Sequence, residues 1–316
     1  MKTENQVDYE ALSKRLGEEK LRQRLLKQAY HWAQLTHQGE GIFKIERYIS
    51  IDKLAEWALK LSLLWPLAHR NIFNIREIEV HWKLEGLPRS FEGFRLLQLS
   101  DLHVDIDPEL ANVIATAVRN CKHDALVITG DYRNTTSQNQ TPSMQMMPQI
   151  LMASDRPRFG IMGNHDFIEK VPALEQHGLR MLLNESACIE HGGANLWLVG
   201  VDDPHFYQTH DFAAARAQVP DGACSILLCH SPEVHREAAE HPFQLMLSGH
   251  THGGQICLPG GRHLICPTKG LPRRFIRGRW QSGSLQGYTS PGTGSCGVAA
   301  RLNCPPEMTV HILHRA

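Results

Sequence analysis

The sequence lacks an excess of charge of either sign, and it lacks a long apolar segment. Its 316 residues include 33 basic and 33 acidic side chains, so the formal net charge is zero. A balanced charge offers no electrostatic attraction for a polyanion, and we expect no nucleic-acid partner. A membrane-spanning helix needs about 18 consecutive apolar residues. The most apolar stretch, residues 54–70, is interrupted by Glu56, Lys60 and Pro66.

The chain lacks the cysteine density of a disulfide scaffold, and a signal sequence is not evident. The eight cysteines form no CxxC motif, whereas secreted disulfide scaffolds are short and rich in cysteine. The first twenty residues are hydrophilic and lack the apolar core of a signal peptide. These features predict reduced thiols and a cytoplasmic location. Peripheral contact with the inner membrane is the alternative, because residues 54–70 fit either a helix packed on the main domain or an amphipathic helix lying on a membrane.

The spacing of apolar residues along the sequence changes near residue 75. Residues 8–36 and about 51–65 carry apolar side chains at helical spacing, whereas residues 75–88 alternate between apolar and polar, which predicts an edge strand. We therefore predict an N-terminal helical extension over residues 1–75, associated with membrane or substrate, and a main domain over residues 76–316.

Short apolar runs dominate the main domain. Runs of four to seven apolar residues that are closed by a small or polar residue are typical of strands buried on both faces. A helical pattern over residues 108–121 separates the first two of them, so an α/β layered domain is expected. The runs lie at 94–100, 125–130, 158–163, 196–200, 224–230 and 243–249.

Five of these runs end on residues that bind metals or transfer protons. Because functional sites collect at the carboxyl ends of strands in α/β sheets, we expect these side chains to meet. The residues are Asp101 and His103, then Asp131, then Asn164, His165 and Asp166, then His230, and finally His250 and His252.

This mixture of carboxylate, amide and imidazole groups suits Mn, Fe, Zn or Mg. Asp101 and His103 are two residues apart, so an extended chain would direct both to one ion. The ligands are too many for one tetrahedral zinc, and two divalent ions that share Asp131 fit the count. Two ions about 3.5–4 Å apart can bind a hydroxide and clamp a phosphoryl group. His165 is then expected to stabilise or protonate the leaving oxygen, with Asp166 orienting its imidazole.

Other polar residues near these motifs have two interpretations each. Arg133 could bind the substrate phosphate, since a guanidinium suits oxyanions, or it could be structural. Asp202, Asp203 and His205 could contact substrate or belong to a structural loop.

Five sequence blocks, in order, resemble the calcineurin-like metallophosphoesterases: SDLH (100–103), GD (130–131), GNHD (163–166), His230 in LLCHSPE, and GHTHGG (249–254). The flanking segments are more narrowly similar to the bacterial YkuE-like branch. The resemblance covers about residues 76–316 and implies a four-layer α/β/β/α sandwich. It implies that Asp101, His103, Asp131 and His252 hold a first metal and that Asp131, Asn164, His230 and His250 hold a second. It also implies that His165 is catalytic.

The predicted function is a dinuclear metal-dependent hydrolase that cleaves a phosphate ester or pyrophosphate through a metal-bridging hydroxide. Its substrate would be a phosphorylated small molecule or a lipid nucleotide. A narrower hypothesis is hydrolysis of UDP-2,3-diacylglucosamine in lipid A biosynthesis. A hypothesis from another class is a non-catalytic metal-bound scaffold.

Overall fold

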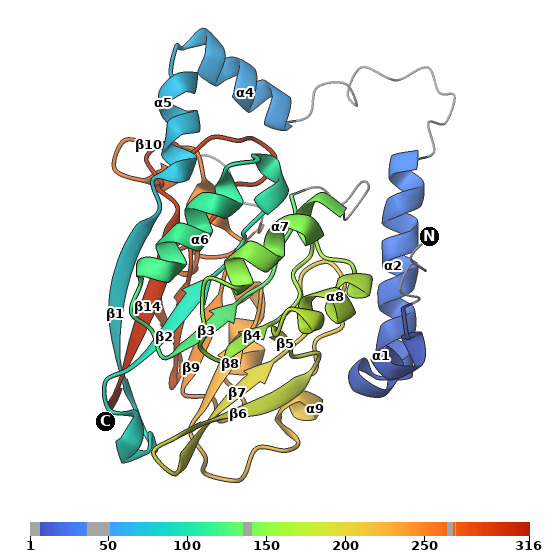
Figure 1. Cartoon of the computed structure of the whole chain (residues 1–316), viewed down its shortest axis with the longest axis vertical. Helices are drawn as coiled ribbons and strands as arrows, with labels where there is room; N and C mark the ends of the chain where they lie inside the picture. Colours follow the sequence, from blue (N-terminus) through green and yellow to red (C-terminus); the bar gives the residue numbers. More distant parts are fainter. Residues whose placement is uncertain (1–6, 37–50, 135–140, 264–267, 269) are drawn as a thin grey trace.

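Two six-stranded sheets lie face to face at the centre of the protein (Figure 1). The computed structural model describes residues 7–36, 51–134, 141–263, 268 and 270–316. The first sheet has the order β1 (Arg76–Leu84), β14 (Glu307–Arg315), β2 (Phe94–Leu99), β3 (Ala125–Ile128), β4 (Arg158–Gly160), β5 (Arg180–Met181). The second has the order β12 (Gly278–Ser282), β13 (Leu285–Thr289), β9 (Leu245–Ser248), β8 (Ser225–Leu228), β7 (Ala194–Gly200), β6 (Glu185–His191).

Helices cover the outer face of each sheet, which completes the predicted four-layer α/β/β/α sandwich. Apolar side chains of both sheets, such as Leu96, Val127 and Leu247, form the core between them. On the outer face of the first sheet lie α6 (Leu110–Asn120), α7 (Thr141–Leu151) and α8 (Val171–Gln176). On the outer face of the second lie the short helices α9 (Phe212–Arg216) and α10 (His235–Ala238).

Each predicted apolar run contains a strand. The runs are apolar because these strands are buried. All four residues of β3, of β8 and of β9 are buried, because one face packs on the other sheet and one on helices. The alternating segment forms β1, which lies at the edge of the first sheet as predicted. Most neighbouring central strands are parallel, so their carboxyl ends share one edge.

The N-terminal helices contact the sandwich in two places. Helices α1 (Tyr9–Leu16) and α2 (Glu18–Thr36) are separated by Gly17, and Leu12, Leu16 and Leu21 join the core beside the first sheet. Helix α4 (Ile51–Leu61) and helix α5 (Trp65–Arg70) lie at the top of Figure 1, where Leu59 packs against Val298. Within the described ranges, no helix has the length and apolarity needed to cross a bilayer. The domain boundary near residue 75 stays a prediction.

A buried histidine between the sheets predicts acid sensitivity. His311 is fully buried, accepts a hydrogen bond at Nδ1 from Trp82 Nε1 (2.9 Å) and donates from Nε2 to Gln98 (2.9 Å). Burial lowers its pKa to about 3. Below pH 6.5 the unfolded chain therefore binds the proton that the folded chain rejects, and stability falls as the pH falls toward 3.

We expect this residue to lower the free energy of unfolding by about 2 kcal/mol between pH 6.5 and 5. Urea unfolding at pH 7.5 and pH 5 measures it, and the His311→Gln variant, which does not titrate, should lose that part of the pH dependence. Equal pH dependence in the two proteins would contradict the assignment.

Candidate active site

The candidate site is built on turns with an unusual backbone. Asp101, His103, Asp131, His250 and His252 have φ values of 51°, 40°, 57°, 70° and 52°, in the left-handed region. They are five of the ten non-glycine residues with positive φ in the described chain. Such conformations cost of order 1 kcal/mol each and concentrate at functional sites. Turns, rather than the extended chain expected from their spacing, therefore place Asp101 and His103, although both still reach the same cluster.

Gly249 allows the turn after β9 to approach the turn after β2. A Cβ atom at this position would overlap the side chains of Ser100 and Asp101. Without it, the backbone N–H of His250 donates to both carboxylate oxygens of Asp101, at 2.9 and 3.1 Å. The close packing of two strand ends, each carrying site residues, thus depends on a glycine.

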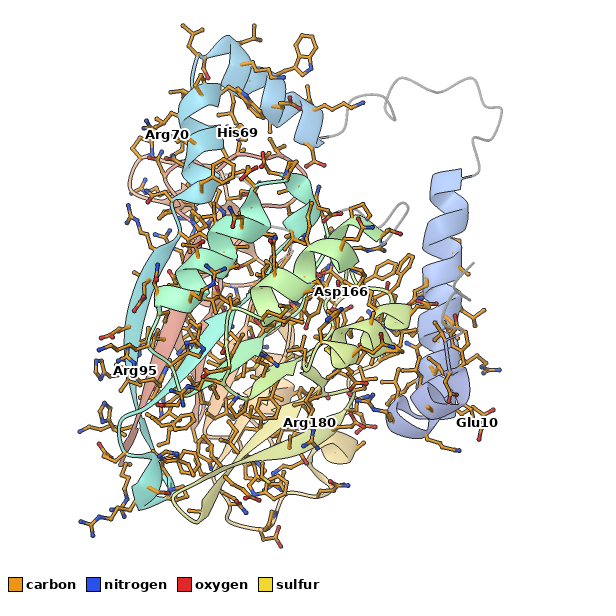
Figure 2. All side chains as sticks on the ribbon, in the orientation of Figure 1. Glu10, His69, Arg70, Arg95, Asp166 and Arg180 are labelled. Atoms are coloured by element: carbon orange, nitrogen blue, oxygen red, sulfur yellow. The ribbon has the colours of Figure 1, made fainter. Side chains whose placement is uncertain are left out.

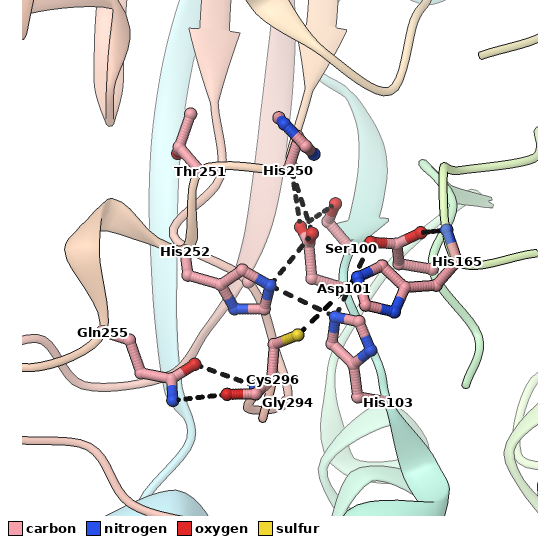
Figure 3. A network of polar contacts seen from close by, with 12 residues as sticks. Ser100, Asp101, His103, His165, His250, Thr251, His252, Gln255, Gly294 and Cys296 are labelled. Atoms are coloured by element: carbon pink, nitrogen blue, oxygen red, sulfur yellow. Dashed lines mark hydrogen bonds and ion pairs between the residues drawn. The ribbon is translucent and has the colours of Figure 1, made fainter. Parts of the chain in front are cut away.

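A first cluster brings together Asp101, His103 and His252 (Figure 3). The Nε2 atoms of His103 and His252 are 3.1 Å apart, and His252 Nε2 is 3.5 Å from Asp101 Oδ1. All three residues are buried. Their ligand atoms therefore converge on one point that is shielded from bulk water.

A second cluster joins Asp131, His230 and His250, with Asn164 beside them. His230 Nε2 and His250 Nδ1 lie 2.9 and 2.8 Å from the Asn164 Oδ1 atom. Asp131 Oδ2 is 3.3 Å from His230 Nε2 and 3.7 Å from His103 Nε2 of the first cluster. Asp131 is therefore the residue that reaches both clusters.

Backbone carbonyls fix the orientation of two of these imidazoles. His103 Nδ1 donates to the carbonyl of Arg133 (2.6 Å) and His230 Nδ1 donates to the carbonyl of Thr129 (2.7 Å). Because a carbonyl only accepts hydrogen bonds, Nδ1 carries the proton and Nε2 faces the site. This is the outer-shell arrangement that metal-binding histidines use.

The electrostatics of the two clusters also suit cations. Burial lowers the pKa of His103 to about 3 and that of His250 and His252 well below the usual value, so these imidazoles are neutral. Burial opposes ionisation of Asp131, but His230 outweighs it and holds the Asp131 pKa well below the usual range. Neutral imidazoles and an ionised carboxylate are the forms that bind divalent metals. His230 is the exception, because burial lowers its pKa but Asp131 outweighs burial and raises the His230 pKa to about 10, so a cation must displace its Nε2 proton. The donor set therefore fits two cations on either side of Asp131.

His165 is held with its Nε2 atom toward the first cluster. Its Nδ1 atom donates to the carbonyl of Asn134 (2.7 Å), its Nε2 is 3.7 Å from Cys296 Sγ, and its ring centroid is 5.0 Å from that of His103. Burial lowers its pKa, but Cys296 and Asp131 outweigh burial and raise the pKa to about 10. Bound cations would oppose this rise by repulsion.

Asp166 does not orient the imidazole of His165, and that prediction is wrong. Its carboxylate accepts the backbone N–H groups of Asp131 (2.7 Å), Tyr132 (3.1 Å) and Gly163 (3.0 Å) and pairs with Lys170 (3.1 Å). Asp166, which is labelled in Figure 2, is fully buried. Asp166 thus fixes the turn that presents Asp131, while a backbone carbonyl takes the orienting role.

The structure favours the structural interpretation of Arg133. Its side chain is 1% exposed, donates to the carbonyl of His165 (2.7 Å) and stacks on Phe167 at 4.0 Å. Its contact with substrate stays a prediction.

The VDDPHF segment divides into structural and site-facing residues. Asp203 accepts the backbone N–H groups of three following residues, and Asp202 forms a fully buried ion pair. His205 instead lies beside the second cluster, with its ring centroid 4.2 Å from that of His250 and its Nδ1 2.6 Å from Glu233.

Cys296, Asn134, Glu233 and Arg24 were missed by reasoning from the sequence. Glu233 ends the LLCHSPE block, in which only His230 was considered, and the other three lie outside the motifs. Each reaches the site through contacts between distant segments. Arg24 is the most distant in sequence from the residues it holds. From α2 it pairs with Asp202 (2.6 Å), donates to the carbonyl of Asp166 (2.8 Å) and stacks on Tyr207.

Replacing Arg24 by methionine is expected to lower the free energy of unfolding by about 3–5 kcal/mol, because it leaves the buried carboxylate of Asp202 without its partner. Lys14→Met is the matched control, since the Lys14–Glu10 pair on α1 is exposed and such pairs contribute less than about 1 kcal/mol. Urea unfolding measures both variants. Equal small losses would show that the Arg24 contact contributes little.

The sequence of this chain is similar to that of known phosphoesterases. Residues 94–254 match the calcineurin-like phosphoesterase family. The chain is 30% identical over 239 residues to the uncharacterized metallophosphoesterase YkuE of Bacillus subtilis, covering 72% of this chain and 81% of that protein. It is 30% identical over 229 residues to the phosphodiesterase YaeI of Escherichia coli, covering 69% and 81%.

Solved structures give weaker similarity. The sulfate thiohydrolase SoxB of Thermus thermophilus has a TM-score of 0.43 at 14% identity, covering 72% of this chain and 57% of that one. The NAD nucleotidase of Haemophilus influenzae has a TM-score of 0.45 at 12% identity, covering 64% and 46%. The chain thus spans about half the length of these solved chains.

Proposed function

Because the chain belongs to the calcineurin-like phosphoesterases and is a metal-dependent phosphoester hydrolase, we propose that it cleaves a phosphate ester or pyrophosphate with two divalent cations. The observation that carries this proposal is the position of Asp131, whose carboxylate lies 3.7 Å from His103 of one buried cluster and 3.3 Å from His230 of the other.

The two clusters divide the ligands between the cations. Asp101, His103 and His252 would hold the first cation, and Asn164, His230 and His250 the second. Asp131 would contact both. Mn, Fe, Zn and Mg all accept such ligands, so the donor set alone does not select among them.

When bound, the two cations supply Lewis acidity to the phosphoryl oxygens and a water of lowered pKa as the nucleophile. The chain's own residues prepare the rest. Asn134 holds the His165 ring so that Nε2 faces the first cluster, where a protonated Nε2 can donate to the leaving oxygen. Asp166 fixes the backbone of Asp131 and so sets the position of the shared carboxylate.

Two alternatives to a hydrolase of unspecified substrate can be tested separately. Hydrolysis of UDP-2,3-diacylglucosamine is the narrower form of this proposal and is tested by adding that compound to a substrate panel. A metal-bound scaffold without catalysis is the alternative from another class. The complete ligand set and the directed His165 disfavour it, because a scaffold needs no proton donor beside its metals.

The direct experiment is turnover by the full chain after removal and return of metal. We expect Mn²⁺-loaded protein to hydrolyse 4-nitrophenyl phosphate or bis(4-nitrophenyl) phosphate, with EDTA removing the activity and added Mn²⁺ restoring it. Metal binding without turnover of either ester, of a cyclic nucleotide or of the lipid nucleotide would favour the scaffold.

A further inference from the structure

An apolar cavity of about 810 Å³ adjoins the first cluster. Helix α4 forms one wall with Leu54, Ala55, Ala58 and Leu59, and the opposite wall includes Ile256 and Val298. His252 and Cys296 line the same cavity. His252 belongs to the first cluster and Cys296 faces His165, so the cavity opens onto the residues that would act on the phosphate.

Three of the polar side chains that line this cavity, Gln255, Thr251 and Ser62, already have partners within the chain. Gln255 donates to the carbonyls of Cys296 and Val298 and accepts from the Cys296 N–H. Thr251 donates to the carbonyl of Ile276, and Ser62 donates to that of Leu59. An occupant therefore finds few free hydrogen-bonding groups on these walls.

The charge of the lining also selects against a polar occupant. Asp52 is the one carboxylate among the described lining residues, and the lining includes no lysine or arginine. A second phosphate or a nucleotide diphosphate would lack a cation there and would meet the Asp52 carboxylate. An uncharged hydrocarbon chain meets no such penalty, and cavities of this size and apolarity are typical of small-ligand sites.

Helix α4, which forms one wall of the cavity, also exposes apolar side chains to solvent. Leu54, Trp57 and Leu61 are 54%, 66% and 79% exposed. Figure 2 shows side chains of α4 projecting away from the sheets at the top of the view. Leu54 belongs both to this exposed set and to the cavity wall, so an apolar path runs from the cavity to the surface.

We propose that the substrate is an amphiphilic phosphoester whose alkyl or acyl chain lies in this cavity while its phosphate lies at the two clusters. This rests on the proposed function and narrows its substrate class. The continuity of the apolar walls with His252 carries the argument, because one molecule can then occupy both parts. A membrane surface bound by the outer face of α4 is the competing explanation of the exposed side chains.

The test uses 4-nitrophenyl alkyl phosphodiesters from methyl to octyl, below their critical micelle concentrations, with the Mn²⁺-loaded full chain. Each buried methylene contributes about 0.8 kcal/mol, which converts to at most about fourfold in affinity. We expect KM to fall about two- to fourfold per methylene until the cavity is filled, with little change in kcat.

Ala58→Trp should remove this dependence on chain length, because the indole occupies the cavity while the methyl ester still reaches the metals. Ala58→Asp should also remove the dependence of KM on chain length, because it places a carboxylate in the apolar cavity. Ala58 is exposed in the absence of a ligand, so both variants should fold. Trp57→Ala is the matched control, since Trp57 is exposed and does not line the cavity. In this variant, KM should depend on the length of the alkyl chain as it does in the unaltered protein.

The outcomes separate the two proposals. No turnover of any ester in the series, nor of 4-nitrophenyl phosphate, a cyclic nucleotide or the lipid nucleotide, overturns the proposed function. Turnover with equal KM for all chain lengths leaves that function standing and overturns the cavity assignment. A dependence that survives in both Ala58 variants and is lost in Trp57→Ala also overturns it and assigns chain binding to the outer face of α4.

Discussion

Replacing Asp131 by alanine is expected to lower kcat/KM by at least about 10⁴-fold, which corresponds to about 5.5 kcal/mol of lost transition-state stabilisation. The reason is geometric. This carboxylate is the group that lies between His103 and His230, so its removal deprives both clusters of a ligand at once. Loss of the second cation should accompany the loss of activity.

Metal analysis by mass spectrometry and turnover on one preparation measure both effects. Asp155→Ala is the matched control, because the side chain of Asp155 is 93% exposed and should change neither value. Circular dichroism shows whether the variant remains folded. A folded Asp131→Ala protein that keeps both metals and a tenth of its activity would refute the shared role of this carboxylate.

Replacing His165 by alanine is expected to lower kcat about 10²–10⁴-fold while metal content stays unchanged. The imidazole is held by the Asn134 carbonyl and is separate from both three-residue clusters around Asp101 and Asp131. If His165 protonates the leaving oxygen, the loss depends on that oxygen. It should be largest for an alkoxide, which needs a proton, and smaller for 4-nitrophenolate, which does not.

Comparing an alkyl phosphate with 4-nitrophenyl phosphate in the variant and the unaltered chain therefore separates acid catalysis from positioning. An equal loss with both leaving groups would contradict the role of proton donor. A collapse of metal content would instead show that His165 is a metal ligand. The measurement can distinguish the two roles, because His165 lies close enough to His103 and Cys296 to share a metal with them.

The architecture was predictable because its signals are local. The β3, β8 and β9 strands appear in the sequence as apolar runs, since both of their faces are buried. The residues after them, such as Asp131 and His230, follow directly in sequence, so a strand end marks their position. The edge strand β1 was also visible, because only one of its faces is buried and its side chains alternate.

What the sequence did not reveal depends on contacts between distant segments. Left-handed turns at Asp101 and His103 take the place of the expected extended chain, because the backbone carbonyls of the turn that follows β3 hold them. Asp166 was assigned to its neighbour His165, whereas its partners lie about 35 residues earlier. Neither the Arg24–Asp202 pair nor the cavity beside α4 leaves a periodic signal in the sequence.

The central claim is that two cations act together across Asp131. Titrating metal-free protein with Mn²⁺ while recording turnover and the electron paramagnetic resonance spectrum tests it most directly. We predict that activity saturates at two ions per chain and that the fully loaded protein gives the signal of a spin-coupled manganese pair, since shared ligands place such ions about 3.5–4 Å apart. Full activity at one ion per chain, with no coupled signal at higher loading, would contradict it.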